Sequence, residues 1–313
     1  MTAALTVENL ALTIAGASVV DDVSFAVAPG EVLAIVGESG CGKSLTAHAV
    51  MRLLPRAVRQ HGGRIRLGND ELSALPERAM RDIRGRRMSM IFQEPQAALD
   101  PLATVGTQVA EALRLPASRA RDKIVGMLTE VGIADPGRRI DQYPFELSGG
   151  MCQRVMIATA LIAGPAVLLA DEPTTALDVT IQAQILDLLR RLATERSTAV
   201  VLITHDMGVV ADIADRVAVM YAGRIAETGP AAAIFAHPRH PYTALLLASI
   251  PRLSDIPKSP LAVIEGRVPA PRDYGPGCRF AGRCPRADAR CTTETPPLRP
   301  LGPEQHAACW HAL

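Results

Sequence analysis

Short runs of consecutive apolar residues alternate with stretches of helical periodicity through about the first 230 residues of the chain. The runs lie at residues 31–36 (EVLAIV), 88–92 (MSMIF), 167–170 (VLLA) and 199–203 (AVVLI). Runs without a polar face are typical of central strands that are covered on both sides of a sheet. One stretch between them spaces its apolar residues for a single helical face, at Ile181, Ile185, Leu188, Leu189 and Leu192. Strands that alternate with helices predict an α/β domain with a largely parallel sheet.

Two segments depart from this alternation. From about residue 102 to residue 163 the pattern is helical throughout, which predicts a helical subdomain inserted into the sheet domain. After residue 250 the periodicity is weak, and residues 251–313 hold eleven of the chain's 24 prolines. We therefore expect a sheet domain over residues 1–250 and a small C-terminal extension over residues 251–313. The extension is expected to be held by something other than a large apolar core.

The composition is ordinary for a soluble globular protein, with 48% hydrophobic and 21% charged residues among 313. A formal net charge of +1 gives no sign of a concentrated basic surface, so we expect no nucleic-acid partner. The N-terminus lacks the basic start and apolar core of a secretory signal. The longest uncharged run, between Arg154 and Asp171, is shorter than the about 20 apolar residues of a membrane span. We expect a cytoplasmic chain that reaches the membrane through partner subunits.

Residues 37–44 read GESGCGKS and lie directly after the apolar run 31–36 and before a helical stretch. The pattern GxxxxGK[ST] between a strand and a helix predicts a phosphate-binding loop. Glycines let backbone N–H groups face the phosphate oxygens, and the helix N-terminus adds partial positive charge. We expect Lys43 to reach the β- and γ-phosphates and the Ser44 hydroxyl to bind Mg²⁺. The nucleotide-binding residues expected in this loop are Gly37, Ser39, Gly40, Cys41, Gly42, Lys43, Ser44 and Leu45.

Cys41 lies inside this loop, at a position that tolerates a small residue. A thiol beside a helix N-terminus can also have a lowered pKa. The position therefore gives the hypothesis that alkylation of this thiol blocks ATP binding unless ATP is already present.

Two adjacent carboxylates, Asp171 and Glu172, end the apolar run VLLA. At the tip of a strand beside a phosphate loop, Asp171 is expected to hold Mg²⁺ directly or through water. Glu172 is then expected to polarise the attacking water.

Residues 147–154, LSGGMCQR, closely resemble the signature of ABC cassettes. The other cassette motifs fall in order around them: Gln93 in IFQEP matches the Q-loop, Asp178 ends the D-loop motif TALD, and His205 in ITHD matches the switch histidine. The resemblance covers about residues 1–250. It implies an α/β P-loop NTPase with a RecA-like core, an antiparallel β subdomain and the inserted helical subdomain.

The resemblance further implies a catalytic arrangement. Two cassettes pack head to tail, and the signature of one approaches the γ-phosphate held by the other. Gln93 is expected to sense Mg²⁺ and the water, and His205 to orient the water and Glu172. Mg²⁺ is assigned to Ser44, Gln93 and Asp171, and the signature residues acting on the partner's nucleotide are Ser148, Gly149, Gly150 and Gln153.

One position departs from the cassette pattern. Where an aromatic residue usually stacks on adenine, the stretch ALTIAGA offers Ile14 as the best match. Aliphatic packing holds the adenine ring less specifically than aromatic stacking does. We therefore expect modest discrimination between ATP and GTP.

The tail after the cassette, HPRHPYTALLLASIP (237–251), is similar to the His-Pro-Tyr segment of ATPases from bacterial dipeptide, oligopeptide and nickel importers. This resemblance implies an ATPase that energises uptake of peptides or a related small solute. It implies four partner subunits: a second homologous ATPase in a homo- or heterodimer, two membrane permease subunits and an extracytoplasmic solute-binding protein. The chain is then expected on the cytoplasmic face of the inner membrane, bound peripherally.

Four of the six cysteines, Cys278, Cys284, Cys291 and Cys309, crowd into the extension. Four thiolates can hold either Zn²⁺ or an iron–sulfur cluster. A structural zinc site would more often show a tight CxxC pair, and none is present. Some members of the resembled group carry a [4Fe–4S] cluster in this tail, which favours the cluster, with zinc and free thiols as alternatives.

Two rival functions stay open. An exporter ATPase commonly carries fused membrane helices, and a non-transport ABC protein that acts on ribosomes or DNA typically has two cassettes or a long coiled-coil insert. The sequence contains none of these features.

Overall fold

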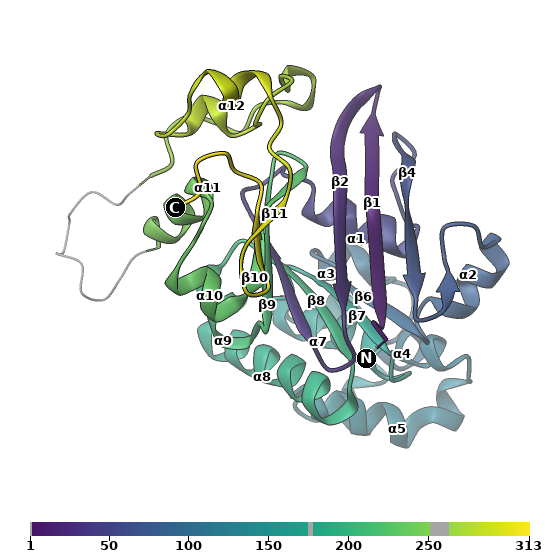
Figure 1. The fold of residues 1–313 in the computed structure, drawn as a ribbon. Helices are drawn as coiled ribbons and strands as arrows, with labels where there is room; N and C mark the ends of the chain where they lie inside the picture. Colours follow the sequence, from purple (N-terminus) through teal and green to yellow (C-terminus); the bar gives the residue numbers. More distant parts are fainter. Residues whose placement is uncertain (1, 175–177, 251–262) are drawn as a thin grey trace. The chain divides into compact units, whose positions relative to one another are not determined.

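The computed structural model describes residues 2–174, 178–250 and 263–313, and these form two compact units that are interleaved along the chain. The first unit is built mainly from Leu67–Ile203, and the second from Thr6–Ala26, Val32–Arg66 and the described part of Thr204–Leu313. Figure 1 shows the elements of both units, and each unit is described by itself.

The first unit contains a parallel sheet of three buried strands. Strands β6 (Met88–Ile91), β7 (Val167–Asp171) and β8 (Ala199–Thr204) lie side by side in the order β6-β7-β8, with β7 in the middle. Every residue of the three strands is buried. The apolar runs therefore correctly predicted strands covered on both faces, although β6 lies at the edge of its sheet and is not a central strand.

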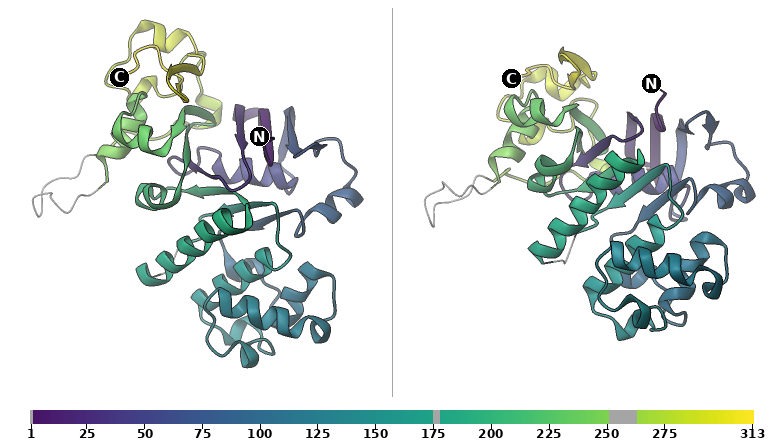
Figure 2. Two further views of the ribbon diagram at one scale, coloured as in Figure 1. Left: turned by 60° about the horizontal axis from the view of Figure 1, so that its bottom comes forward. Right: turned by 90° about the horizontal axis from the view of Figure 1, so that it is seen from below.

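Helices follow one another without a strand between residues 95 and 161 of the first unit (Figure 2). Helix α4 packs against α5 and α7. Farther along the chain, α8 (Val179–Arg196) buries four of the five apolar positions that formed its predicted face, and Ile181 stays partly exposed. The helices of the first unit are α2 (Glu77–Ile83), α3 (Pro95–Ala98), α4 (Val105–Leu113), α5 (Ala117–Glu130), α6 (Pro136–Arg139), the 3-10 turn η1 (Pro144–Glu146), α7 (Gly149–Leu161) and α8, with the short strand β5 (Asp70–Glu71) before them.

The second unit begins with a hairpin. Strands β1 (Leu5–Ile14) and β2 (Ala17–Val27) are joined by the two residues Ala15 and Gly16, which both have positive φ, at 48° and 82°. Positive φ at both central residues is the mark of a type I′ turn, whose twist suits a tight hairpin. Strand β4 (Val58–Leu67) lies on the other side of β1.

A second sheet of this unit combines strands from both ends of the chain. Its order is β11-β12-β10-β9-β3, where β3 (Val32–Val36) and β9 (Arg216–Tyr221) are parallel and the rest antiparallel (Figure 1). The extension supplies β11 (Arg299–Gly302) and β12 (Gln305–Ala307), and β12 pairs with the edge of β10 (Arg224–Pro230). The helices of the second unit are α1 (Lys43–Met51), α9 (Met207–Ile213), α10 (Ala231–Ala236), α11 (Pro241–Ala248), α12 (Ala289–Thr293) and the 3-10 turns η2 (Pro271–Asp273) and η3 (Ala281–Arg283).

The extension is also held by apolar packing, contrary to the expectation from its proline content. Phe280 is buried in the core of the second unit, with its ring centroid 5.0 Å from that of Tyr221 and 5.3 Å from that of Tyr242. The burial of a single aromatic residue cannot be predicted from periodicity, because it needs no repeated apolar spacing in its own segment. No helix in the described part of the chain has the length and apolar character needed to cross a membrane.

Candidate functional site

The phosphate-loop residues 37–44 connect β3 to α1 in the second unit, and two glycines in it are required by close backbone packing. Gly37 has φ of 150°, and a Cβ there would lie 2.1 Å from the Met220 carbonyl oxygen. Gly42 has φ of 101°, and its Cβ would lie 2.9 Å from a methyl carbon of Val20. Both contacts are shorter than real Cβ contacts, so only glycine fits at these positions.

Lys43 is the first residue of α1 and is buried, with 6% of its surface exposed. Its Nζ donates hydrogen bonds to the carbonyl oxygens of Gly37 (2.7 Å) and Glu38 (3.1 Å). The ammonium group is thus held inside the curve of the loop at a helix N-terminus, the arrangement that binds phosphate. Ser39 and Gly40 are exposed on this loop, and Ser44 and Leu45 are partly buried.

The expected lowered pKa of Cys41 is wrong. Its side chain is fully buried, and desolvation raises the pKa of the thiol, although Lys43 acts in the opposite direction. Burial opposes the charged thiolate more strongly than the nearby lysine favours it. Cys41 packs against the loop, and its Sγ would be 3.0 Å from a Cβ at Gly37.

The two carboxylates lie at the end of β7 in the first unit. Asp171 is buried, with 1% exposed. Glu172 follows with φ of 47°, an uncommon value for a non-glycine residue, and its N–H donates to the Ile203 carbonyl (2.8 Å). The Gln93 side-chain amide donates to a Glu172 carboxylate oxygen at 3.1 Å. Strained backbone of this kind is concentrated at functional sites.

The signature and the D-loop residue also lie in the first unit, each at the start of a helix. Ser148 caps α7 and accepts a hydrogen bond from the Met151 N–H (3.3 Å), and a Cβ at Gly149 would meet no atom within 4 Å. Asp178 caps α8 in the same way, through the Ile181 N–H (2.9 Å). Residues 175–177 of the D-loop motif lie outside the described residues. Ser148, Gly150 and Asp178 line one cavity, so the structure brings these two motifs together.

Gln153, in contrast, faces inward. Only 1% of it is exposed, and its side-chain amide donates to the Pro173 carbonyl oxygen at 2.6 Å. This contact joins the signature helix to the segment that directly follows Glu172. Its observed partner is the backbone of its own chain.

The remaining predicted residues belong to the second unit. His205 is exposed just after β8, beside Asp206, whose carboxylate caps α9 through the Gly208 N–H (2.8 Å). Ile14 is partly buried at the end of β1. The predicted site residues thus fall into two sets, one in each unit: the phosphate loop, Ile14 and His205 in the second, and Gln93, Asp171, Glu172, the signature and Asp178 in the first.

The four cysteines of the extension line one small cavity, together with Phe280 and Pro241. None of them forms a disulfide. Burial raises the pKa of Cys278 to about 11 and also raises the pKa values of Cys291 and Cys309. Cys291 and Cys309 are buried, and Cys278 and Cys284 are partly buried. Thiols that converge in this way are typical ligands of a metal centre, because a bound metal compensates the thiolate charge.

Four thiolates can hold either Zn²⁺ or an iron–sulfur cluster. The shared cavity of the four cysteines is compatible with either kind of centre.

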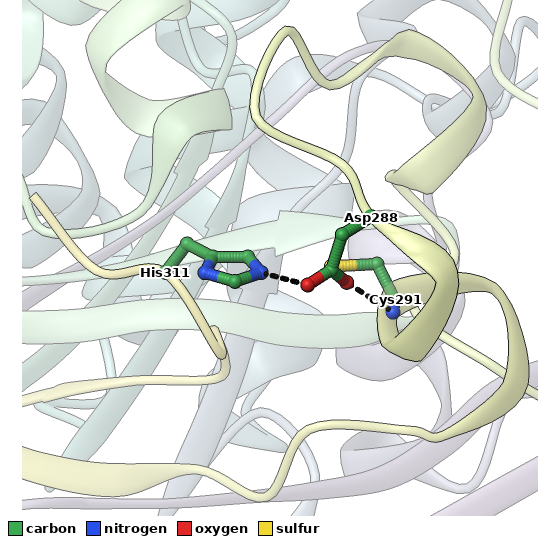
Figure 3. A group of neighbouring side chains, drawn as sticks. All are labelled: Asp288, Cys291 and His311. Carbon is green, nitrogen blue, oxygen red and sulfur yellow. Dashed lines mark hydrogen bonds and ion pairs between the residues drawn. The ribbon is translucent and has the colours of Figure 1, made fainter.

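Figure 3 shows a second group beside this cavity, formed by Asp288, Cys291 and His311, whose ligand atoms all lie within 4.8 Å of one another. Both carboxylate oxygens of Asp288 have other partners: the Cys291 N–H at 3.0 Å, as a helix cap, and His311 Nε2 at 2.8 Å. These two contacts explain why the three side chains lie together: Asp288 caps the start of α12 and also pairs with His311.

Sequence reasoning missed three residues that meet at the phosphate loop: Glu38, Tyr242 and Arg283. The Glu38 N–H donates to the Tyr242 hydroxyl oxygen (3.0 Å), and its carboxylate is paired with Arg283. Tyr242 belongs to the His-Pro-Tyr segment, so the sequence did single out this segment. It did not indicate that Tyr242 contacts the phosphate loop.

Comparison with known proteins identifies the family of the chain. Residues 20–175 match the ABC transporter family, and residues 226–291 match the oligopeptide/dipeptide transporter C-terminal region. The chain is 49% identical to the dipeptide transport ATP-binding protein DppD of Bacillus subtilis, over 98% of this chain and 94% of that protein. It is 50% identical to the probable peptide ABC transporter ATP-binding protein y4tR of Sinorhizobium fredii, over 93% of this chain and 88% of that one.

Solved structures agree with the fold. The dimeric post-hydrolysis state of the ATP-binding cassette MJ0796, bound to ADP and Pi, superposes with a TM-score of 0.66 and 26% identity, covering 72% of this chain and 98% of that one. The cassette CbiO1 of Clostridium perfringens gives a TM-score of 0.64 and 28% identity, covering 75% and 92%. The expected cassette fold is thereby confirmed, and the chain belongs to the ABC transporter family as an ATP-binding subunit that carries the oligopeptide/dipeptide C-terminal region.

Proposed function

We propose that this chain hydrolyses ATP to energise the uptake of peptides or a related small solute through an ABC importer. The observation that carries the proposal is the Gln93–Glu172 hydrogen bond at the end of β7, because it joins the proposed general base to the residue proposed to sense the nucleotide. The peptide relatives, which match almost the whole chain, support the substrate class.

In this proposal the phosphate loop binds the nucleotide. Lys43 exchanges its hydrogen bonds with the Gly37 and Glu38 carbonyls for the β- and γ-phosphates, and the backbone N–H groups of the loop hold the remaining oxygens. Ser44, Gln93 and Asp171 serve the Mg²⁺ that the phosphates bring. Ile14 covers the base and gives modest preference for ATP over GTP.

Glu172 polarises the attacking water, and His205 orients it. The signature of a second cassette completes the site: Ser148, the open backbone at Gly149 and the adjoining Gly150 approach the γ-phosphate at a helix N-terminus, where negative charge is stabilised. Asp178 takes part at the same interface. Gln153 holds the start of this helix to the segment after Glu172.

The same proposal assigns the partners. A second homologous ATPase forms a homo- or heterodimer with this chain, two membrane permease subunits carry the solute, and an extracytoplasmic binding protein delivers it. The chain then binds peripherally at the cytoplasmic face of the inner membrane.

For the extension we propose a [4Fe–4S] cluster held by Cys278, Cys284, Cys291 and Cys309, with Zn²⁺ as the alternative. The resemblance of the tail favours the cluster, and the shared cavity of the four cysteines supports a common centre. Such a centre supplies structural cross-links here, since hydrolysis needs no electron transfer. The chain's own residues provide a buried, apolar wall through Phe280 and Pro241.

The test uses the intact transporter purified with its membrane subunits. ATP hydrolysis that solute and binding protein stimulate, together with peptide uptake lost in Lys43→Ala, is the expected result. Co-purification with ribosomes or DNA instead, or export of the solute, would refute the importer function. Arg119→Gln, at an exposed position on α5, is the matched control and is expected to transport normally.

A further inference from the structure

Glu38 of the phosphate loop is held by the C-terminal part of the chain at two separate groups. Its N–H donates to the Tyr242 hydroxyl, and its carboxylate forms a two-pronged pair with Arg283: Nη1 to Oε2 at 2.6 Å and Nη2 to Oε1 at 3.0 Å. Its carbonyl oxygen meanwhile accepts from Lys43. Each polar group of Glu38 therefore has a partner, and two of the three partners come from beyond residue 230.

Arg283 is fixed in this position by its other hydrogen bonds. Nε donates to the Glu265 carbonyl (2.7 Å), Nη2 to the Ile264 carbonyl (3.1 Å) and Nη1 to the Tyr221 hydroxyl (3.3 Å). Only 7% of its side chain is exposed, against 29% for Glu38. Bidentate arginine–carboxylate pairs out of water are among the stronger polar contacts, whereas exposed pairs contribute little.

The segment around Arg283 borders the cysteine-lined cavity and is held by a backbone hydrogen bond. Arg283 ends the 3-10 turn η3, and Cys284 is the next residue. Before the turn, the Cys278 N–H donates to the Cys291 carbonyl at 2.7 Å, which closes the segment on itself. The guanidinium therefore has little freedom to move away from the loop unless this segment opens.

We propose that Arg283 is a positioning residue of the nucleotide site: it holds Glu38, and so fixes the phosphate-binding curve of the loop in which Lys43 and the backbone N–H groups are presented. The inference rests on the proposed function of the loop in binding ATP. It assigns the extension a part in nucleotide affinity, since the loop is preorganised by residues 245 positions away in sequence. A flexible loop would lose conformational entropy when it binds ATP. A loop that is already fixed has lost that entropy before binding, so binding costs less free energy.

The alternative is an ion pair that stabilises the fold without affecting the loop. The two can be separated by a double-mutant cycle in the full-length chain, with Arg283→Gln, Glu38→Gln and the double variant. The affinity for a fluorescent ATP analogue with Mg²⁺ and the unfolding temperature are measured on each. If Arg283 acts through Glu38, each single variant binds about tenfold more weakly, and the double variant binds no more weakly than either.

Two further variants sharpen the result. Arg283→Lys keeps the charge with a single nitrogen and is expected to bind within about threefold of the unchanged chain. Arg290→Gln removes an exposed pair with Glu294 in the same extension and is expected to leave affinity unchanged. Equal affinity of Arg283→Gln and the unchanged chain, or independent losses that multiply in the double variant, would overturn the inference.

Failure of the proposed function gives a different pattern. If the unchanged chain does not bind the nucleotide, or if Lys43→Ala binds it as well as the unchanged chain, the loop is not the ATP site and the proposed function fails. If the unchanged chain binds and Lys43→Ala does not, the function stands, and Arg283→Gln alone decides the inference.

Discussion

The side-chain amide of Gln93 donates a hydrogen bond of 3.1 Å to the carboxylate of Glu172, at the end of a fully buried strand. The amide thus lies on the oxygen that would receive the proton of the attacking water. Because Glu172 also has a positive φ, its direction is set by the backbone, and the Ile203 carbonyl holds that backbone in place. The proposed base and its glutamine partner are therefore held in one arrangement by the backbone and this hydrogen bond.

Replacing the base separates binding from hydrolysis. In Glu172→Gln the side chain keeps its shape but can no longer take a proton, so hydrolysis is expected to fall at least about 100-fold while ATP binding remains. Single-turnover hydrolysis and equilibrium ATP binding, measured on the same preparation, check this. Substantial hydrolysis by the variant would mean that another group acts as the base.

Replacing the glutamine tests its contact with the base. Gln93→Leu loses one hydrogen bond to a charged group, and kcat is expected to fall about tenfold with little change in ATP affinity. The matched control is Gln60→Leu, on β4 in the second unit, which is expected to hydrolyse ATP at the normal rate. A loss of affinity without a loss of kcat would contradict the role in hydrolysis.

The buried thiol of Cys41 gives a prediction about chemical modification. Because desolvation raises its pKa and its side chain is buried, alkylation near pH 7.5 is expected to be slow, both with and without ATP. Modification is expected to become fast only in denaturant. Peptide mass spectrometry over a time course measures the rate at this site. Fast alkylation in the folded chain, slowed by ATP, would show that the loop opens and would contradict the packing described here.

The cysteine cavity gives a prediction about metal content. Anaerobically purified protein is expected to contain about four iron and four sulfide per chain, and Cys284→Ser is expected to lose both. The control is Cys152→Ser, since Cys152 lies in α7 of the first unit, with its Sγ 3.4 Å from the Pro144 carbonyl oxygen. One zinc per chain would support the alternative centre, and no metal in fresh protein would refute both.

The central strands and the phosphate loop could be predicted from sequence because each is a local feature. Strands β6, β7 and β8 are apolar runs, and the loop between β3 and α1 is an eight-residue motif that is recognised from its own residues. The role of Glu172 came from the pair of carboxylates at the end of a strand, and the role of Gln93 came from resemblance. Their hydrogen bond came from the structure, since 79 residues separate them.

The extension could not be predicted in the same way. Strands β11 and β12 are four and three residues long, too short for alternation to be recognised, and β11 contains a proline. Their pairing with β10, and the contact of Arg283 with Glu38, connect segments that are far apart in sequence. The prediction of a lowered pKa for Cys41 was wrong for a related reason. Its position beside a helix N-terminus is read from the sequence, but its burial depends on the fold.

The pairing of β10 with β12 has a consequence during synthesis. About 75 residues separate the end of β10 from the start of β12, so a ribosome that adds roughly 5–20 residues per second needs about 4–15 s to produce the partner strand. For that time the hydrogen-bonding edge of β10 has no partner within the finished part of the second unit. Unprotected strand edges recruit other chains. The nascent chain therefore passes through a brief interval of aggregation risk, which ends only when its last few residues fold onto the sheet.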